Sequence, residues 1–563
     1  MLSTDNKTNI VKYAFCYIIF MALFVRLWGI WNVSTTDEYN EVIEGLRVCS
    51  GHINLERWIK RFYLYILSVE YAVYYILWSV FNSFSGPMEF AEKIVRNMGP
   101  LFTLGRLTSV VAGTLTVGVL FKTGYKFFDR KVAVVASILL AITPFHVDLS
   151  QQVKVDAVLG LMVVSTLYYI LKLMHGSNVS KWDYGWCGFF MALAIQTKIN
   201  SILLFIPFLI TVSFGYKMVK ERIFNFSKFF IMFFIIGFIL GNPPILIAPV
   251  KFVKSIMGLG NVYTTGVNVV PNDIIGFLAY PLYYFRSMGM VISILTILSI
   301  IYVLVHRKKR QIVILSFIVS FYILMGASKN LVAYYYLIPV VPFIFILVGE
   351  FLSDMHTRFV QNSGPVCTKK LILTLFIFFA LIKPAINVVS HGISLSGKNT
   401  RYLARDWIEA NIPPGSKILM DSGKSINSFA PPIAENRESM ERTLKKARGN
   451  VNEGKIIHGM VDKNALIYYE LLLKTVPVIS YDITSTMFGL DVEDIGYYKK
   501  NEYEYIILSS GMLKDRTSEF FRKQNSRVAS FYKSVYSEKG VTLIKTISPT
   551  TYNQGDTFFI YKL

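Results

Sequence analysis

Residues 101–147 read LFTLGRLTSVVAGTLTVGVLFKTGYKFFDRKVAVVASILLAITPFHV. Two apolar runs, at about 101–121 and 131–147, flank a short basic segment at 122–131. Apolar runs of this kind cross a bilayer as helices, and short loops rich in Lys and Arg stay on the cytoplasmic side. The stretch therefore predicts two membrane helices joined by a cytoplasmic loop.

The composition of the whole chain is that of a membrane protein. Of its 563 residues, 53% are hydrophobic and only 17% are charged, which is too little charge to cover a soluble protein of this length. The formal net charge is +22, but the basic residues lie in short clusters between apolar runs, as the positive-inside rule predicts. Nucleic-acid binding is therefore disfavoured.

The order of the apolar runs follows from the basic loops. A first run at about 11–31 comes after Lys7 and Lys12 with no evident cleavage site, which predicts a retained signal anchor with a cytoplasmic N-terminus. If the apolar stretch at 62–84 crossed the membrane, the basic segment at 122–131 would lie outside. We therefore interpret 53–84 as helices at the outer interface, within an outer first loop at 32–100.

The later runs alternate between the two sides of the membrane. Residues 185–216 are expected to form two short helices broken near 197–200, because one long helix would invert every later loop. The sequence thus predicts a polytopic α-helical membrane protein with about eleven spans. The expected spans lie at about 11–31, 101–121, 131–147, 156–174, 185–197, 199–216, 229–247, 288–305, 311–327, 333–352 and 371–389.

The character of the chain changes after about residue 392. Residues 393–563 carry charged segments, prolines and short apolar runs, and we expect a small α/β domain outside the membrane, separate from a membrane domain at 1–392. Strands are expected at 417–420, 476–480, 505–508, 541–544 and 558–561, and helices at 401–411, 438–447 and 464–474. None of the four cysteines lies in this domain, so no disulfide framework is expected there.

Two adjacent acids follow the first span. Asp37 and Glu38 lie in the stretch WGIWNVSTTDEYNEVIEG at residues 28–45, where an acid would stand just outside the membrane. An ordinary polar loop that contains acids is the alternative interpretation. In an extended segment the two side chains would point in opposite directions, so Asp37 is the candidate and Glu38 a secondary, structural acid.

Other ionisable residues fall at the outer ends of the expected spans. Charge inside a membrane is costly, so such residues gathered at one depth indicate a site. The alternatives are that Lys and Arg anchor in headgroups and that Asp156 caps a helix. The candidates are Arg26, Lys154, Asp156, Lys198, Arg286 and Lys329, with His146, Tyr335 and Tyr336 lining the expected cavity.

Several short motifs occur in a fixed order between residues 11 and 420. They are Asp37-Glu38 in a long outer loop, Arg106 at the start of the second span, Pro144 and His146 before Lys154 and Asp156, Thr197-Lys198 after a short helix, Tyr336, Pro339 and Pro342 at a spacing of three, and a helix at 401–413. Together they resemble the GT-C glycosyltransferases related to protein O-mannosyltransferases and to the aminoarabinose transferases of lipid A. Gln151 and Tyr335 depart from the pattern, because relatives often carry Arg at both places.

The resemblance implies transfer of a sugar from a polyprenyl-phosphate carrier to a protein, lipid or glycan acceptor outside the membrane. Asp37 would be the base, Asp156 would orient the acceptor or a cation, and one displacement would invert the anomeric carbon. Cations would neutralise the departing phosphate. The expected phosphate contacts are Lys154, Lys198 and Lys329, with Arg26 and Arg286 in reserve.

The resemblance implies a multi-pass protein of the plasma membrane that needs no cofactor. The sequence shows no dense carboxylate cluster and no His pair at ligand spacing, so a divalent metal is not indicated. One alternative is a transporter or flippase of lipid-linked glycans, although transporters place ionisable groups near the bilayer midplane and show duplicated halves. The other is a non-catalytic membrane scaffold, in which Asp37 and Asp156 are loop and cap residues.

Overall fold

The structure is a computed structural model of the chain. It describes residues 4–33, 35–51, 61–82, 86–174, 179–216, 220–265, 276–327, 333–361, 366–421, 430–452, 463–486, 492–516, 525–537 and 540–563. The chain forms two compact units, which are described separately below. The first comprises Met1–Trp28, Ile43–Glu70 and Leu104–Gly392, and the second comprises Gly29–Val42, Tyr71–Thr103 and Ile393–Leu563. The division into domains at 1–392 and 393–563 stays a prediction.

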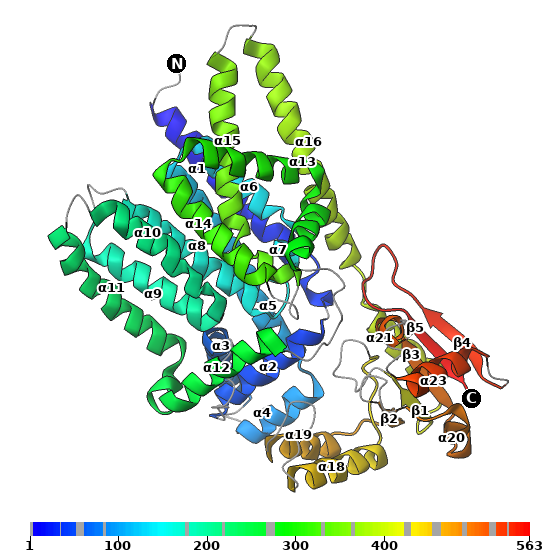
Figure 1. The fold of residues 1–563 in the computed structure, drawn as a ribbon. Helices are drawn as coiled ribbons and strands as arrows, with labels where there is room; N and C mark the ends of the chain where they lie inside the picture. The colour runs from blue at the N-terminus through cyan, green and yellow to red at the C-terminus, as the bar shows by residue number, and fades with distance from the viewer. Residues whose placement is uncertain are drawn as a thin grey trace. The chain divides into compact units, whose positions relative to one another are not determined.

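Up to residue 394 the described chain is helical (Figure 1). The α-helices are α1 Thr4–Leu27, α2 Thr36–Cys49, α3 Arg61–Phe81, α4 Pro87–Arg96, α5 Gly99–Phe127, α6 Arg130–Ala141, α7 Pro144–Ser150, α8 Val155–Met174, α9 Lys181–Thr197, α10 Phe205–Tyr216, α11 Lys220–Gly241, α12 Pro249–Thr265, α13 Gly276–His306, α14 Lys309–Gly326, α15 Val341–Gln361 and α16 Val366–Ser394. Short 3-10 helices are η1 Ile30–Asn32, η2 Ile199–Leu204, η3 Pro243–Leu246 and η4 Tyr334–Leu337.

Many of these helices suit a bilayer. Six helices within the described ranges are long and apolar enough to cross a membrane, and α6 with α7, bent by 62°, would form a seventh. Helix α3 is one of the six by length and composition, and its expected place at the interface stays a prediction. Large apolar side chains on α1 are exposed in the absence of lipid, as lipid-facing residues are, including Tyr13, Tyr17 and Phe20. The predicted polytopic helical class is confirmed.

The expected break within residues 185–216 is also confirmed. Helix α9 ends at Thr197, and the backbone of Lys198 is extended, with φ −155° and ψ 122°. The 3-10 helix η2 and then α10 follow directly. The main chain therefore turns at Lys198, and this turn fixes where its ammonium group is presented.

Close packing in the first unit depends on glycine. Helices α9 and α11 lie side by side, and a Cβ atom at Gly188 would come within 2.4 Å of the Phe230 carbonyl oxygen. A Cβ atom at Gly237 would come within 2.8 Å of the Phe189 carbonyl oxygen. Small residues let membrane helices approach closely enough to gain packing energy without a hydrophobic driving force. The close pairing of α9 with α11 therefore depends on glycine, which has no side chain, at positions 188 and 237.

We expect Gly188→Ala to destabilise the first unit, because its methyl group must displace backbone rather than a movable side chain. Overpacking of this kind costs about 1–3 kcal/mol. Thermal unfolding of the full chain in detergent measures the effect. Gly118→Ala is the control, since its Cβ would meet only the end of the Ile19 side chain, at 3.3 Å. Equal unfolding temperatures for the two variants would contradict the role assigned to Gly188.

The second unit contains a mixed sheet with strand order β2-β1-β3-β5-β4. The strands are β1 Lys417–Met420, β2 Asp482–Ser485, β3 Tyr505–Ser509, β4 Thr542–Ile547 and β5 Phe558–Lys562. Strands β2 and β3 both pair parallel to β1, whereas β5 pairs antiparallel to β3 and to β4. The remaining helices are α17 Thr400–Asn411, α18 Arg437–Asn452, α19 Lys463–Lys474, α20 Ile495–Lys500, α21 Ser510–Arg516 and α23 Ser526–Ser537.

Both faces of this sheet are covered. On one face, Ile418 and Met420 of β1 pack with Ala404 and Ile408 of α17. On the other face, Leu419 packs with residues of α20 and α23. Successive side chains of a strand point to opposite faces, so the continuous apolar run of β1 is what a central strand between two layers requires.

Two local predictions were wrong. The strand expected at 476–480 is instead β2 at Asp482–Ser485; Pro477 interrupts the apolar run, and Val478 is 96% exposed. Backbone pairing with β1, rather than apolar content, selects the polar edge strand. Residues 36–38 were expected to be extended, but they begin α2. Acids in a first helical turn interact favourably with the helix dipole, which offers a structural reason for Glu38.

A partly buried carboxylate lies where β3 ends and β5 begins. Asp556 accepts hydrogen bonds from the hydroxyls of Ser509 and Ser510, at 3.3 and 3.5 Å. Burial raises the pKa of the Asp556 carboxyl, and the two hydroxyl donors only partly oppose this effect. Ionisation of Asp556 therefore costs more in the folded state than in the unfolded state.

The sign of the pH dependence follows from this raised pKa. The stability that Asp556 contributes is fully present below about pH 4, the unfolded pKa, and is lost as pH rises through the folded value. We expect Asp556→Asn to raise the unfolding temperature at pH 7 relative to the unsubstituted chain and to bring little gain near pH 4. Thermal unfolding at the two pH values checks this. A lower unfolding temperature for the variant at pH 7 would contradict it.

Candidate functional site

A broken span in the first unit is closed by a buried arginine. The bend between α6 and α7 leaves carbonyl groups at the end of α6 without helical partners. Arg26 of α1 donates Nη1 to the Ala141 oxygen at 3.2 Å and Nη2 to the Leu140 oxygen at 3.4 Å. Its Nη2 also lies 2.9 Å from His146 Nδ1. The side chain is completely buried, so Arg26 acts as a cap on the broken helix.

The residues around Arg26 share this structural role. His146 is only 1% exposed and accepts the Arg26 bond, and the Ser150 hydroxyl donates to the His146 carbonyl at 2.5 Å. A Cβ at Gly113 would meet Arg26 Nε at 3.0 Å, so helix α5 must carry glycine there. These contacts give Arg26 and His146 a structural role in holding α1, α6 and α7 together. Their predicted roles as a phosphate contact and a lining residue stay predictions.

Asp156 and Lys198 form a buried ion pair. Asp156 lies in the first turn of α8 and Lys198 lies at the break after α9, and Lys198 Nζ is 2.9 Å from Asp156 Oδ1. The side chains are 12% exposed for Lys198 and 4% exposed for Asp156. The structure therefore brings together two predicted site residues that are 42 positions apart in the chain. Buried pairs like this are costly to dehydrate and keep their charges only when matched.

Two tyrosines complete this arrangement. Lys198 Nζ lies 4.8 Å from the ring centre of Tyr335 and 4.5 Å from that of Tyr336, both in η4. Lys154 Nζ lies 5.2 Å from the same Tyr335 ring. Aromatic faces attract cations at these distances. Two ammonium groups thus converge on one ring, where an arginine was expected from the family pattern.

Sequence reasoning missed a neighbouring polar network centred on Asp148. The Tyr334 hydroxyl donates to Asp148 Oδ2 at 3.0 Å, and Gln152 Nε2 donates to Oδ1 at 2.8 Å. His391 Nε2 lies 3.7 Å from the same carboxylate. In the sequence, the Pro-x-His-x-Asp run of α7 pointed to Asp148, and the three consecutive tyrosines of η4 pointed to Tyr334. His391 lies in the last turn of the long apolar helix α16 and carries no local signal.

Gln151, one of the departures from the family pattern, is used structurally. It is fully buried, and its Nε2 donates to the carbonyls of Val25 and Trp28 at 3.2 and 2.8 Å. Its Oε1 lies 2.8 Å from His391 Nε2. An amide supplies both a donor and an acceptor here, and an arginine would supply only donors. Gln151 therefore joins the end of α1 to α16.

The acid pair of the first loop belongs to the second unit. Glu38 is only 1% exposed and accepts a bond from the Thr35 backbone N–H at 3.3 Å. Burial lowers the pKa of Arg401 in α17, and the charges of Tyr402 and Glu38 partly oppose this shift. Glu38 is thus an internal counter-charge for the unit, as expected of a structural acid. Asp37 lies in the first turn of α2, but its side chain lies outside the described part of the structure.

Two other predicted cations do not join the cluster. Lys329 falls in residues 328–332, outside the described ranges. Arg286 lies in α13 and borders a separate cavity, discussed below. The described residues include no group of three His, Cys, Asp or Glu side chains placed to hold a metal. The predicted independence from metals and cofactors stays a prediction.

The described site is a charged, aromatic-lined cluster at helix breaks. Its lysines can neutralise an anion, and Asp156 and Asp148 can hold lysine or hydroxyl donors in place. All its members come from α7, the turn at 151–154, α8, η4, α16 and the break at Lys198 within the first unit. The arrangement suits recognition of a phosphate group beside a membrane more than metal or thiol chemistry.

Comparisons with known proteins agree with this geometry. Residues 95–247 match the model of the dolichyl-phosphate-mannose-protein mannosyltransferase family. This range contains Lys154, Asp156 and Lys198. No curated protein sequence matches the chain.

Solved structures give the fold. The apo oligosaccharyltransferase of Archaeoglobus fulgidus has a TM-score of 0.50 and 11% identity, covering 89% of this chain and 69% of that one. The same enzyme tethered to an acceptor peptide has a TM-score of 0.50 and 12% identity, covering 92% of this chain and 72% of that one. ArnT of Cupriavidus metallidurans bound to undecaprenyl phosphate has a TM-score of 0.48 and 11% identity, covering 99% of this chain and 98% of that one. The predicted GT-C fold and the resemblance to this group of glycosyltransferases are confirmed.

The ion pair of Asp156 and Lys198 can be tested by a double-mutant cycle. Lys198→Met leaves a buried carboxylate unpaired, which costs about 3–5 kcal/mol, and Asp156→Leu strands the lysine in the same way. We expect the double variant to recover most of the lost stability, as measured by thermal unfolding in detergent. Additive losses would show that the two side chains do not depend on each other.

Proposed function

We propose that the protein is a membrane glycosyltransferase that moves a sugar from a polyprenyl-phosphate carrier to an acceptor outside the membrane. The observation that carries this proposal is the convergence of Lys154 and Lys198 on Tyr335, next to Asp156. These lysines and Asp156 lie inside the range that matches the mannosyltransferase family model. The GT-C fold supports the same reaction class, although it does not specify the sugar.

The lysine cluster is proposed to hold the donor phosphate. The lipid tail of the carrier keeps its phosphate at the membrane, so the protein must supply cations there. As the glycosidic bond breaks, negative charge grows on the phosphate, and positioned ammonium groups stabilise it. Asp156 keeps Lys198 in place before the donor binds, and the aromatic faces allow both lysines to remain close together. Lys329 is proposed as a third phosphate contact with Arg26 in reserve, and Arg286, the other reserve cation, borders the separate cavity discussed below.

Asp37 is proposed to activate the acceptor. The bond between the anomeric carbon and the phosphate oxygen breaks, and a bond to the acceptor oxygen forms from the opposite side. The acceptor proton passes to the Asp37 carboxylate, and the carrier phosphate leaves with the bonding electron pair. One displacement of this kind inverts the configuration at the anomeric carbon. The acceptor is a protein, lipid or glycan group on the outer side of the plasma membrane.

We expect Asp37→Asn to abolish release of sugar from a synthetic polyprenyl-phosphate donor, because an amide cannot take the proton. General-base catalysis typically contributes about 10²- to 10⁴-fold, so the loss of rate should fall in that range. Turnover by the purified full chain, with thermal unfolding as a check of folding, measures the effect.

Glu38→Gln is the matched control. Because Glu38 is buried and faces the charge of Arg401, we expect a lower unfolding temperature but retained turnover at low temperature. Unchanged turnover in Asp37→Asn would remove Asp37 from the mechanism and leave the transferase. Absence of both donor binding and turnover in the unsubstituted protein would favour the transporter or scaffold alternatives.

A further inference from the structure

A separate cavity opens in the first unit between α13 and α16. It has a volume of about 360 Å³, within the ~300–1,000 Å³ typical of ligand pockets. Its apolar lining consists of Phe285, Met288, Met290, Val291, Phe379 and Ala380. Two cations, Arg286 and Lys383, also border it. An apolar cavity that carries two positive charges and no acid in its lining matches an anionic amphiphile.

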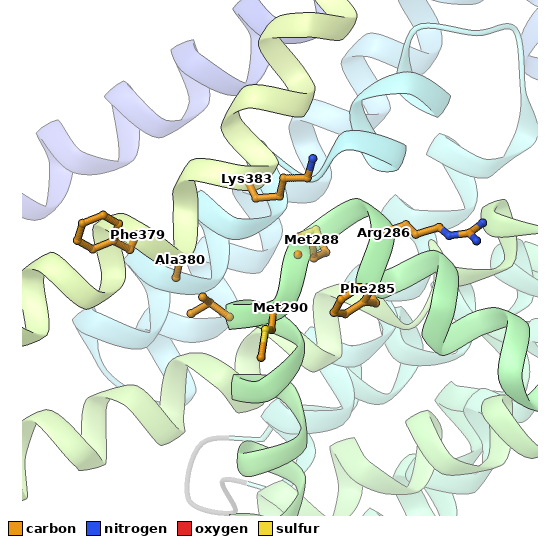
Figure 2. Close-up of a pocket in the computed structure, with 9 residues that line it drawn as sticks. Phe285, Arg286, Met288, Met290, Phe379, Ala380 and Lys383 are labelled. Carbon is orange, nitrogen blue, oxygen red and sulfur yellow. The ribbon is translucent and has the colours of Figure 1, made fainter.

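The lining is divided between an apolar end and a charged end. In Figure 2, Phe379 and Ala380 lie at one end of the cavity, and the charged groups of Lys383 and Arg286 are directed toward the other. Methionine and phenylalanine accept flexible hydrocarbon chains well, because their surfaces are adaptable or broad. The cavity therefore offers room for a hydrocarbon segment and a contact for a headgroup.

The two cations have no partner among the residues that the structure describes. Neither Arg286 nor Lys383 has a hydrogen bond or an ion pair among the residues that the structure describes. Lys383 lies six residues inside the outer end of the expected span at 371–389, about 9 Å along the helix. Charge at such a depth is costly in a membrane unless it is matched or reaches the interface. A negatively charged headgroup is the partner that a bilayer can supply.

A kink in α13 creates the space. Gly289 has φ 79° and ψ 174°, which interrupts the helix, and a Cβ there would meet the Lys383 side chain at 2.9 Å. Asn387 Nδ2 donates to the Ser287 carbonyl at 3.0 Å, which satisfies one group beside the kink. Lys383, Asn387 and His391 recur every four residues, so they share one face of α16. The cavity thus lies about 12 Å along this helix from His391, which contacts Gln151.

We propose that this cavity binds an anionic phospholipid of the surrounding bilayer, with its phosphate on Lys383, a second positive charge from Arg286 at the border of the cavity, and an acyl segment against Phe379 and Ala380. The bound lipid holds α16 against the kinked α13, and through His391 it steadies the network around Asp148. The proposal does not depend on the glycosyltransferase function. It places Arg286 outside the donor-phosphate cluster.

The surroundings favour a bilayer lipid over the carrier lipid as the occupant. Phe285, Met290 and Phe379 are 46%, 65% and 61% exposed, so the cavity is bordered by a surface suited to hydrocarbon. Bilayer phospholipids reach such a surface at far higher local concentration than a minor carrier, and occupancy follows mass action. The lysines proposed for the carrier phosphate are instead Lys154 and Lys198.

The test is lipid retention by the purified full chain. Protein reconstituted in nanodiscs of equal phosphatidylglycerol and phosphatidylcholine is released into detergent, and bound lipid is counted by native mass spectrometry. We expect one phosphatidylglycerol to be retained in preference to phosphatidylcholine. Lys383→Gln should lower its retention about tenfold, since hydrogen bonds to charged groups are worth ~1.5–3 kcal/mol. Lys383→Arg should preserve retention.

Two further variants sharpen the test. Lys254→Gln removes an exposed lysine of α12 that does not border the cavity, and it should retain lipid normally. Ala380→Leu fills the apolar end while leaving both cations, and it should lose lipid even if Lys383→Gln proves unstable. Equal retention by Lys383→Gln and the unsubstituted chain would overturn the proposal, as would equal binding of both phospholipids. Displacement of phosphatidylglycerol by a small mole fraction of polyprenyl phosphate would assign the cavity to the carrier instead.

Discussion

The contact between Arg26 and the end of α6 is the interaction on which the first unit depends. A helix broken inside a membrane exposes carbonyl groups that neither lipid nor water can satisfy there. Arg26 supplies several donors from one rigid group and binds the Leu140 and Ala141 carbonyls. At the 62° bend into α7, the Leu140 carbonyl also accepts a bond from the Thr143 N–H at 3.3 Å, and Arg26 supplies further donors to both carbonyls. The positions of Asp148 and of the turn that leads to Asp156 follow from the bend.

The same physical problem recurs at Lys198. The break after α9 carries a charged side chain at a place where charge is costly, and Asp156 supplies the counter-charge at 2.9 Å. Both helix breaks are therefore stabilised by a charged or polar side chain from a distant part of the chain. The polar groups so gathered, together with the tyrosines of η4, form a cluster of lysines and acids, and its Lys154, Asp156 and Lys198 lie within the range that matches the mannosyltransferase family model. Broken helices thus serve to bring polar groups to one level.

The second unit is stabilised by apolar cores on the two faces of its sheet, as in soluble globular domains. Its central parallel strands β1 and β3 are buried on both faces, and its helices α17, α20 and α23 cover them. Glu38, although it precedes this domain by more than 350 positions, is part of the unit and acts on the charge of Arg401. A chain segment next to the first membrane helix is therefore an internal component of the second unit. This explains why an acid can be retained at Glu38 without any part in chemistry.

The sequence by itself determined the helical membrane class, the break near residue 198 and the strands predicted at 417–420, 505–508 and 558–561. These features follow from apolar length, basic loops and alternating or continuous apolar runs, which are local properties. Only the tertiary structure decided that Arg26 contacts His146 and the end of α6, that Asp148 and His391 lie in one polar network, and that Lys154 and Lys198 share the Tyr335 ring. It also decided that residues 36–38 begin a helix. Such outcomes depend on which distant residue supplies a missing hydrogen bond or counter-charge, and no local pattern records that choice.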